Sequence, residues 1–190
     1  MIEAPRTPPP PPRPARSQRA LDVMDAARRV LELEGPDALT MRRLGEKLGI
    51  KAPSIYKHFP DKAALELALV EQALVEIGNV LHGAIIARRV RNTTRNVIAE
   101  LLRAYRIHSV NNPNLYRLAT SGPLARDALP PGLEDWAGEP FLLATRDPHK
   151  AQALWSFAHG MVILEIDGRF PEDSELERTW DAGVTAFGRR

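Results

Sequence analysis

The stretch from Thr40 to Lys62, TMRRLGEKLGIKAPSIYKHFPDK, most constrains what this chain can fold into. Thr40 carries the hydroxyl of a helix N-cap, and Leu44 and Leu48 lie four residues apart on one face of the helix that follows. Gly49 supplies the backbone freedom for a sharp turn. Two short helices joined by a glycine turn form a helix-turn-helix, whose second helix can enter the major groove of DNA.

The second helix of this pair is predicted to run from about Pro53 to Phe59, because proline is tolerated at the first helical position and Pro60 stops the helix. Ile55 and Phe59 lie four residues apart and are expected to face inward. The remaining side chains can donate hydrogen bonds to phosphates and base edges, and they are Ser54, Tyr56, Lys57 and His58. A generic helical hairpin with solvated charges is the alternative interpretation.

Together with the preceding helix, this stretch resembles the N-terminal DNA-binding domain of the TetR (tetracycline-repressor-like) family. The similarity runs without a gap from VMDAARRVLELEG through ALTMRRLGEKLGI to APSIYKHFPDKAAL, and the most specific part is the Tyr-x-His-Phe-x-x-Lys ending at Lys62. The resemblance implies that DNA bases lie near Lys51, Ala52, Pro53, Tyr56 and Lys57. It implies that phosphates lie near Thr40, Arg42, Ser54, Tyr56, His58 and Lys62.

Composition agrees with a globular protein that binds DNA through its N-terminal part. The chain is 44% hydrophobic and 26% charged. Residues 1–60 hold 11 Lys and Arg against 7 Asp and Glu, a balance of +4, and the rest of the chain holds 15 against 17, a balance of −2. The absence of cysteine excludes disulfides and cysteine-based metal sites. No apolar run approaches a membrane span and no signal-peptide core is present, so we expect a cytoplasmic protein without a membrane partner.

Three regions are predicted along the chain. Residues 1–16 are rich in proline and arginine, which indicates a disordered or polyproline II arm. The arm could contact DNA, form a solvated tail or bind another protein as a proline-rich ligand. Residues 17–60 form the helix-turn-helix domain, and residues 61–190 form a helical ligand-binding and dimerisation domain.

All regular elements are expected to be helices, so the fold class is all-α. The first helix is predicted over Ser17–Glu34 with an apolar stripe of Val23, Ala27, Val30 and Leu31. A long helix capped by Asp61 and running to about Arg89 follows, with a stripe of Leu65, Leu69, Ala73, Ile77, Val80 and Ala84. Another helix is expected from near Thr93 to Asn111, with Ile98, Leu101, Leu102 and Tyr105 on its core side. Tyr116 and Leu118 indicate a short helix that Gly122-Pro123 breaks, and a further helix is expected only over Phe141–Thr145.

The last two helices, roughly Pro148–Gly168 and Glu175–Arg189, are predicted to hold two copies of the chain together. The first is apolar nearly all round and must be covered on more than one face. Trp180 and Phe187 supply area that would otherwise be exposed. The expected homodimer interface comprises Phe157, Gly160, Leu164, Leu176, Trp180, Gly183, Val184 and Phe187. The Trp155…His159-Gly160 segment also resembles the C-terminal domain of a TetR subgroup named for its Trp-His-Gly (WHG) pattern.

A small apolar or aromatic ligand is expected in a largely apolar cavity of the middle helices. The candidate residues are Leu101, Tyr105, His108, Tyr116, Phe141 and Trp155. The alternative is that these side chains simply fill the core. The chain lacks a phosphate loop, a nucleophile elbow and paired histidines at metal-ligand spacing, so we expect no enzyme, no cofactor and no metal.

The TetR resemblance therefore implies a transcriptional repressor. It would bind a palindromic double-stranded DNA operator as a homodimer, and a small-molecule ligand would release it. The alternative is a helical ligand-binding or scaffold protein whose DNA-binding unit is non-functional. The intact Tyr56, Lys57, His58 and Lys62 favour the repressor.

Overall fold

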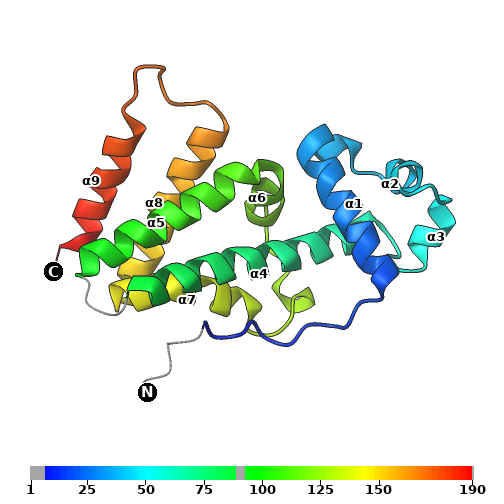
Figure 1. Cartoon of the computed structure of the whole chain (residues 1–190), viewed down its shortest axis with the longest axis horizontal. Helices are drawn as coiled ribbons and strands as arrows, with labels where there is room; N and C mark the ends of the chain where they lie inside the picture. Colours follow the sequence, from blue (N-terminus) through cyan, green and yellow to red (C-terminus); the bar gives the residue numbers. More distant parts are fainter. Residues whose placement is uncertain (1–6, 89–92, 190) are drawn as a thin grey trace. The chain divides into compact units, whose positions relative to one another are not determined.

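The computed structural model describes residues 7–88 and 93–189, and every regular element within these ranges is helical (Figure 1). The α-helices are α1 Gln18–Glu34, α2 Met41–Leu48, α3 Ala52–Tyr56, α4 Lys62–Arg88, α5 Thr94–Asn111, α6 Pro113–Thr120, α7 Leu133–Thr145, α8 Pro148–Ile166 and α9 Leu176–Gly188. Two 3-10 turns, η1 Pro36–Ala38 and η2 Arg126–Ala128, lie between them. The all-α prediction is confirmed. The predicted end of the long helix near Arg89 lies outside the described residues.

The chain divides into two compact units. The first, which we call the helix-turn-helix unit, holds Pro11–Leu74 and Asn112–Glu134, and it contains α1 to α3, the start of α4, and α6. The second, which we call the body unit, holds the described residues 7–10, 75–88, 93–111 and 135–189. The body unit contains the end of α4, then α5, most of α7, α8 and α9.

The core of the helix-turn-helix unit forms around α1, whose predicted apolar stripe is buried throughout. Ser17 starts the helix by accepting a hydrogen bond from the Ala20 backbone N–H at 3.2 Å, and Gly35 ends it. Val23 and Ala27 are fully buried, and they pack with residues of α2, α3 and the first half of α4. This burial fixes the small helices that carry the exposed polar side chains.

α6 is attached to α1 by a carboxylate. Pro113 opens α6 and has no backbone N–H, so the first free donors of this helix belong to Asn114 and Leu115. Glu32 of α1 accepts both of them, Leu115 N–H at 2.8 Å and Asn114 N–H at 3.2 Å. Asn114 in turn donates its side-chain amide to the Leu31 carbonyl at 3.0 Å. A residue of α1 therefore caps a helix more than 80 positions later in the chain.

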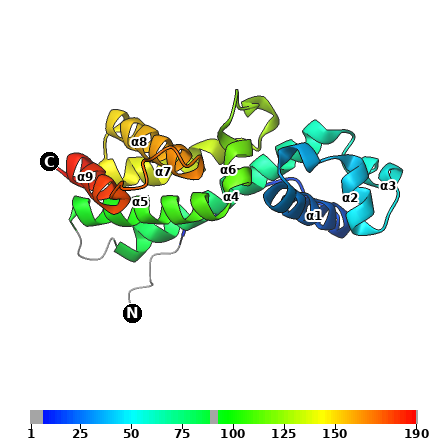
Figure 2. The ribbon, with the colours of Figure 1, turned by 90° about the horizontal axis from the view of Figure 1, so that it is seen from above.

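In the body unit, α5 packs against both α8 and α9, and Figures 1 and 2 show these helices side by side. The predicted core side of α5 is confirmed, since Ile98, Leu101, Leu102 and Tyr105 are all buried. Arg106 links the three helices through Glu165 of α8 at 2.9 Å and Glu177 of α9 at 2.6 Å.

Two details of the predicted helices are wrong. The helix expected over Phe141–Thr145 begins earlier, at Leu133, and continues through Pro140. A side chain of α4, His82, supplies to the Trp136 carbonyl the hydrogen bond that Pro140 cannot donate. On α4 the predicted stripe includes Val80, which is 37% exposed, whereas the neighbouring Leu81 is buried. α4 is apolar on several sides, so spacing alone does not identify its buried face.

None of the helices within residues 7–88 and 93–189 combines the length and the apolar character needed to cross a membrane.

Candidate nucleic-acid interface

The helix-turn-helix is held by local caps and by one close backbone contact. The Thr40 hydroxyl accepts the Arg43 backbone N–H at 3.1 Å, as the N-cap prediction requires, and Gly49 adopts a left-handed φ of 64° at the turn. Gly45 was not singled out from the sequence. A Cβ at this position would lie 2.7 Å from the Ile50 carbonyl oxygen, so the turn can pass close to α2 only over a glycine. The turn therefore depends on two glycines: Gly49 adopts the left-handed backbone conformation, and Gly45 allows the close approach to α2.

The second helix, α3, is shorter than predicted. It starts at Ala52 with Pro53 in its first turn and ends at Tyr56, and a turn carries the chain on to Phe59. The Ile55 carbonyl accepts the backbone N–H groups of both His58 and Phe59, and this pattern closes the turn. Ile55 and Phe59 are 0% and 2% exposed, so the predicted inward face is confirmed.

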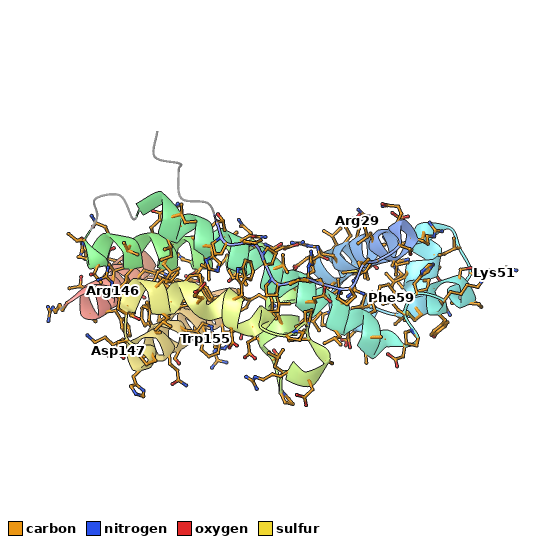
Figure 3. All side chains as sticks on the ribbon, turned by 90° about the horizontal axis from the view of Figure 1, so that it is seen from below. Arg29, Lys51, Phe59, Arg146, Asp147 and Trp155 are labelled. Atoms are coloured by element: carbon orange, nitrogen blue, oxygen red, sulfur yellow. The ribbon has the colours of Figure 1, made fainter. Side chains whose placement is uncertain are left out.

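The residues predicted to contact DNA flank this anchored helix. Tyr56 is 49% exposed, and Lys51 and Lys57 are exposed as well. Figure 3 shows Lys51 projecting from the far end of the helix-turn-helix. Thr40, Arg42, Pro53 and Lys62 are exposed, whereas Ala52, Ser54 and His58 are half-buried. The structure thus brings all ten candidates together in one unit, on α2, on α3 and at the adjoining helix ends.

The basic side chains of this region differ in whether they are paired. Within the described residues, Lys51 and Lys57 have no carboxylate at ion-pair distance. Lys62 lies 3.4 Å from Glu66 of its own helix. On α2, Arg42 pairs with Glu46, and both Arg43 and Lys47 pair with Glu34 of α1. Hydrogen bonds from the Arg43 guanidinium and the Lys47 ammonium hold the pKa of Glu34 down at about 2.

Neighbouring segments support the end of α3. Asp61 caps α4 by accepting the Ala64 backbone N–H at 2.7 Å, as predicted. Ser17 Oγ lies 3.4 Å from Nδ1 of His58. The guanidinium of Arg16 lies 6.0 Å from the Phe59 ring centroid, and this arginine also donates to the buried carboxylate of Glu71 at 2.7 Å. The part of the proline-rich arm around Arg16 therefore packs onto this unit, whereas its Arg6 lies outside the described residues.

The candidate ligand residues do not all lie in one unit, and they differ in how deeply they are buried. Tyr105 and Phe141 meet edge to face in the body unit with ring centroids 5.7 Å apart, and Leu101 is fully buried on α5. His108 is half-buried on the same helix. Tyr116 belongs to the helix-turn-helix unit, and Trp155 is 45% exposed. Trp155 stacks on His159 of α8, and burial lowers the pKa of His159.

Most of the candidate dimer residues already pack within one chain. Phe157 contacts the rings of Trp180 and Phe187, at centroid distances of 5.7 and 5.9 Å. The expectation that Trp180 would be exposed without a second copy is wrong, because it is 6% exposed beneath Arg106. Gly183 and Val184 are buried in the same contact, and Leu176 is half-buried. Leu164 is 41% exposed, and nothing within 4 Å would meet a Cβ at Gly160.

No group of three or more His, Asp or Glu side chains in residues 7–88 and 93–189 is arranged to hold a metal ion.

A helix-turn-helix on a small helical unit, with exposed cations on its second helix, defines a DNA-binding regulator. The model of bacterial regulatory proteins of the tetR family matches residues 23–69, and the tetracyclin repressor-like C-terminal domain model matches residues 98–187. The chain belongs to the TetR family of transcriptional regulators.

Relatives and solved structures agree with this family. The HTH-type transcriptional regulator Rv0681 of Mycobacterium tuberculosis is 28% identical over 164 residues, which are 82% of this chain and 73% of the relative. The class A tetracycline repressor from transposon 1721 of Escherichia coli is 46% identical over 54 residues, only 28% of this chain and 25% of that repressor. A Rhodococcus sp. RHA1 protein of unknown function has the same fold, with a TM-score of 0.74, 20% identity, and 91% and 97% of the two chains covered.

Proposed function

We propose that the chain is a repressor that binds a palindromic operator as a homodimer and leaves it when a small molecule binds. The observation that carries this proposal is α3, a short helix anchored by the buried Ile55 and bearing the exposed Tyr56 and Lys57. One such helix reads only a few base pairs, so two copies about one DNA turn apart, ~34 Å, are needed for specificity. Because operator DNA lies inside the cell, the proposal includes a cytoplasmic location for the protein.

In this proposal α3 reads bases and the surrounding residues hold the phosphates. The residues that we propose to contact bases lie on α3 or at its two ends, and they are Lys51, Ala52, Pro53, Tyr56 and Lys57. Phosphate contacts fall to Thr40, Arg42, Ser54, His58 and Lys62 together with Tyr56. Lys51 and Lys57 are exposed, and no carboxylate among the described residues lies at ion-pair distance from either of them. Both observations support the proposal that these two lysines contact DNA.

The dimer face that we propose lies on α8. Leu164 is 41% exposed, the half-buried Phe157 lies on the same side of α8, and Gly160 on this side leaves open space on the helix surface. A second copy packed there would bury these apolar side chains, and twofold pairing is the commonest assembly. Since Trp155, His159 and Gly160 also carry the Trp-His-Gly pattern, we propose that the chain falls in the WHG subgroup.

The ligand that we propose is neutral or weakly charged and partly aromatic. Tyr105 and Phe141 offer aromatic edges, Leu101 an aliphatic wall, and His108 a polar group on the same helix as Tyr105. A thermal-shift screen of small metabolites tests this part of the proposal, with Tyr105→Leu as the variant that should lose the response.

DNA binding is tested by a mobility-shift assay on the DNA upstream of the chain's own gene. Binding should weaken steeply with salt because phosphate contacts release counterions. We expect Lys62→Ala to weaken binding to every sequence alike, and Lys57→Ala also to change the preferred sequence. Equal affinity at low and high salt would contradict the proposal and favour the alternative, a helical ligand-binding or scaffold protein whose DNA-binding unit is non-functional.

A further inference from the structure

Two carboxylates neutralise most of the charge that α2 carries. The carboxylate oxygens of Glu46 lie 3.2 Å from Nε of Arg42 and 3.3 Å from Nη1 of Arg43. Glu34, the last residue of α1, lies 2.7 Å from Arg43 and 2.9 Å from Lys47. Three positive side chains therefore meet two negative ones, and the network keeps a net charge of one.

These carboxylates stay charged at any physiological pH. The pKa of Glu34 is lowered to about 2, chiefly by its hydrogen bond with Arg43. The pKa of Glu46 is lowered as well, first by Arg42 and then by Arg43. Both carboxylates of this network are therefore available to pair with the cations of α2 throughout the physiological pH range.

The charges on α3, the helix proposed to contact bases, are not neutralised as those on α2 are. Lys51 at its start and Lys57 at its end are exposed, and the described residues place no carboxylate at ion-pair distance from either. The unbalanced positive charge of the helix-turn-helix is therefore concentrated at α3. In a helix-turn-helix the first helix crosses the phosphate backbone, which every DNA sequence offers equally.

We infer that Glu34 and Glu46 are specificity-determining residues, which limit the affinity of α2 for DNA of any sequence and leave sequence readout to α3. The inference rests on the proposed mode of DNA binding, in which α2 and α3 both face the DNA. A cation released from its carboxylate can reach phosphates of any sequence in any register, whereas on the operator α3 fixes the register, so paired cations on α2 lower non-operator affinity more than operator affinity. Glu34 also holds Arg43 and Lys47 of α2 against α1, and Glu46 holds Arg42 along α2 itself, so these cations are kept from reorienting toward phosphates.

Glu46→Gln is the principal test, because Glu46 is exposed and its loss leaves Arg43 paired with Glu34. Affinity is measured for the upstream operator duplex and for a scrambled duplex of equal length, at several salt concentrations. We expect affinity for the scrambled duplex to rise about three- to tenfold, with a log–log salt slope steeper by about 0.9 for one more phosphate contact. Operator affinity should rise less, so the ratio of the two affinities falls.

A matched control and a reversal accompany this variant. Asp25→Asn removes one negative charge from the exposed i,i+4 pair with Arg29 on α1, and Figure 3 shows Arg29 well away from Lys51. It should leave both affinities unchanged. Adding Arg42→Gln to Glu46→Gln restores the charge balance, and it should return scrambled-duplex affinity toward that of the wild type.

Glu34→Gln should act in the same direction as Glu46→Gln, and a thermal melt checks that the link between α1 and α2 survives. The inference is overturned if Glu46→Gln keeps the wild-type affinity ratio, or if Asp25→Asn lowers that ratio as much. A wild type that binds both duplexes equally would instead contradict the proposed function, and the inference with it.

Discussion

His82 donates its Nε2–H to the backbone carbonyl of Trp136 at 2.9 Å, and this carbonyl is the one that Pro140 leaves without a partner inside α7. In an uninterrupted helix the residue four positions later would supply the donor, but proline has no N–H. A carbonyl can only accept, so Nε2 must carry the proton. The His82 ring is 1% exposed and lies 4.9 Å from the Trp136 ring, which fixes the bond in place.

Replacing His82 by leucine should destabilise the chain by about 1–3 kcal/mol, because the Trp136 carbonyl loses the donor that His82 supplies. Pro140→Ala supplies a backbone N–H to the same carbonyl, so the loss from His82→Leu should be smaller in that background. Urea unfolding of the four chains in this double-mutant cycle measures the coupling. Strict additivity would show that His82 acts through packing rather than through the carbonyl of Trp136.

Glu32 is expected to stabilise the helix-turn-helix unit through the first turn of α6. Glu32→Ala removes the acceptor of two backbone N–H groups, and such caps are worth about 0.5–2 kcal/mol. Glu32→Gln keeps one acceptor oxygen and should cost less. The midpoint of urea unfolding gives both values, with the exposed Glu172→Ala as the control. A loss no greater than that of the control would contradict the cap.

The salt bridge between Arg16 and Glu71 makes the end of the proline-rich arm part of the folded unit. The side chain of Glu71 is 7% exposed, and Arg13 lies 3.7 Å from it as well. Arg16→Gln should cost about 1–3 kcal/mol, less than for a fully buried pair because Arg16 is 23% exposed. Arg19→Gln, whose pair with Asp22 is exposed, should cost under about 0.5 kcal/mol. Similar losses from both variants would restore the solvated-tail interpretation of the arm.

Burial of His159 predicts a pH dependence of stability. Its folded pKa lies below the usual 6.5 because burial penalises the charged ring. Between the two pKa values the unfolded chain binds more protons, so the unfolding free energy should fall as pH drops below 6.5 and level off below the folded pKa. His159→Phe keeps an aromatic ring beside Trp155 and should flatten this dependence. Identical pH profiles for the wild type and the variant would rule out a contribution from His159.

Local signals predicted the helix-turn-helix because its caps and turns depend on neighbouring residues. Ser17, Thr40 and Asp61 each cap the helix that follows within three positions, and Gly49 adopts the left-handed turn. The buried pair Ile55 and Phe59 also follows from spacing alone.

The failures involve partners that are distant in the sequence. α7 continues through Pro140, and the donor that Pro140 lacks is supplied by His82, 54 residues before Trp136. The cap of α6 by Glu32 spans 83 residues. Trp180 is covered by α5 and α8 of its own chain, and a stripe on α9 does not reveal which surface covers it.

Two glycines of the last helices should respond oppositely to substitution. A Cβ at Gly183 would lie 2.2 Å from the Phe157 ring, so Gly183→Ala should force α9 away from α8 and destabilise the single chain by about 1–3 kcal/mol. At Gly160 nothing lies within 4 Å, so a larger side chain fits the single chain. There, replacing glycine inside a helix should itself stabilise α8 by up to about 1 kcal/mol.

If two copies pair through the exposed side of α8, then Gly160→Arg should separate them without unfolding the chain. The arginine would enter the apolar contact that Leu164 makes on this side of α8 and bring an unpaired charge into it. We expect sedimentation velocity at micromolar concentration to give a dimer for the wild type and a monomer for Gly160→Arg, with unchanged helical circular dichroism. Operator affinity should then fall by orders of magnitude although α3 is untouched, because a single reading helix contacts only half of the site. A Gly160→Arg protein that remains dimeric would place the interface elsewhere.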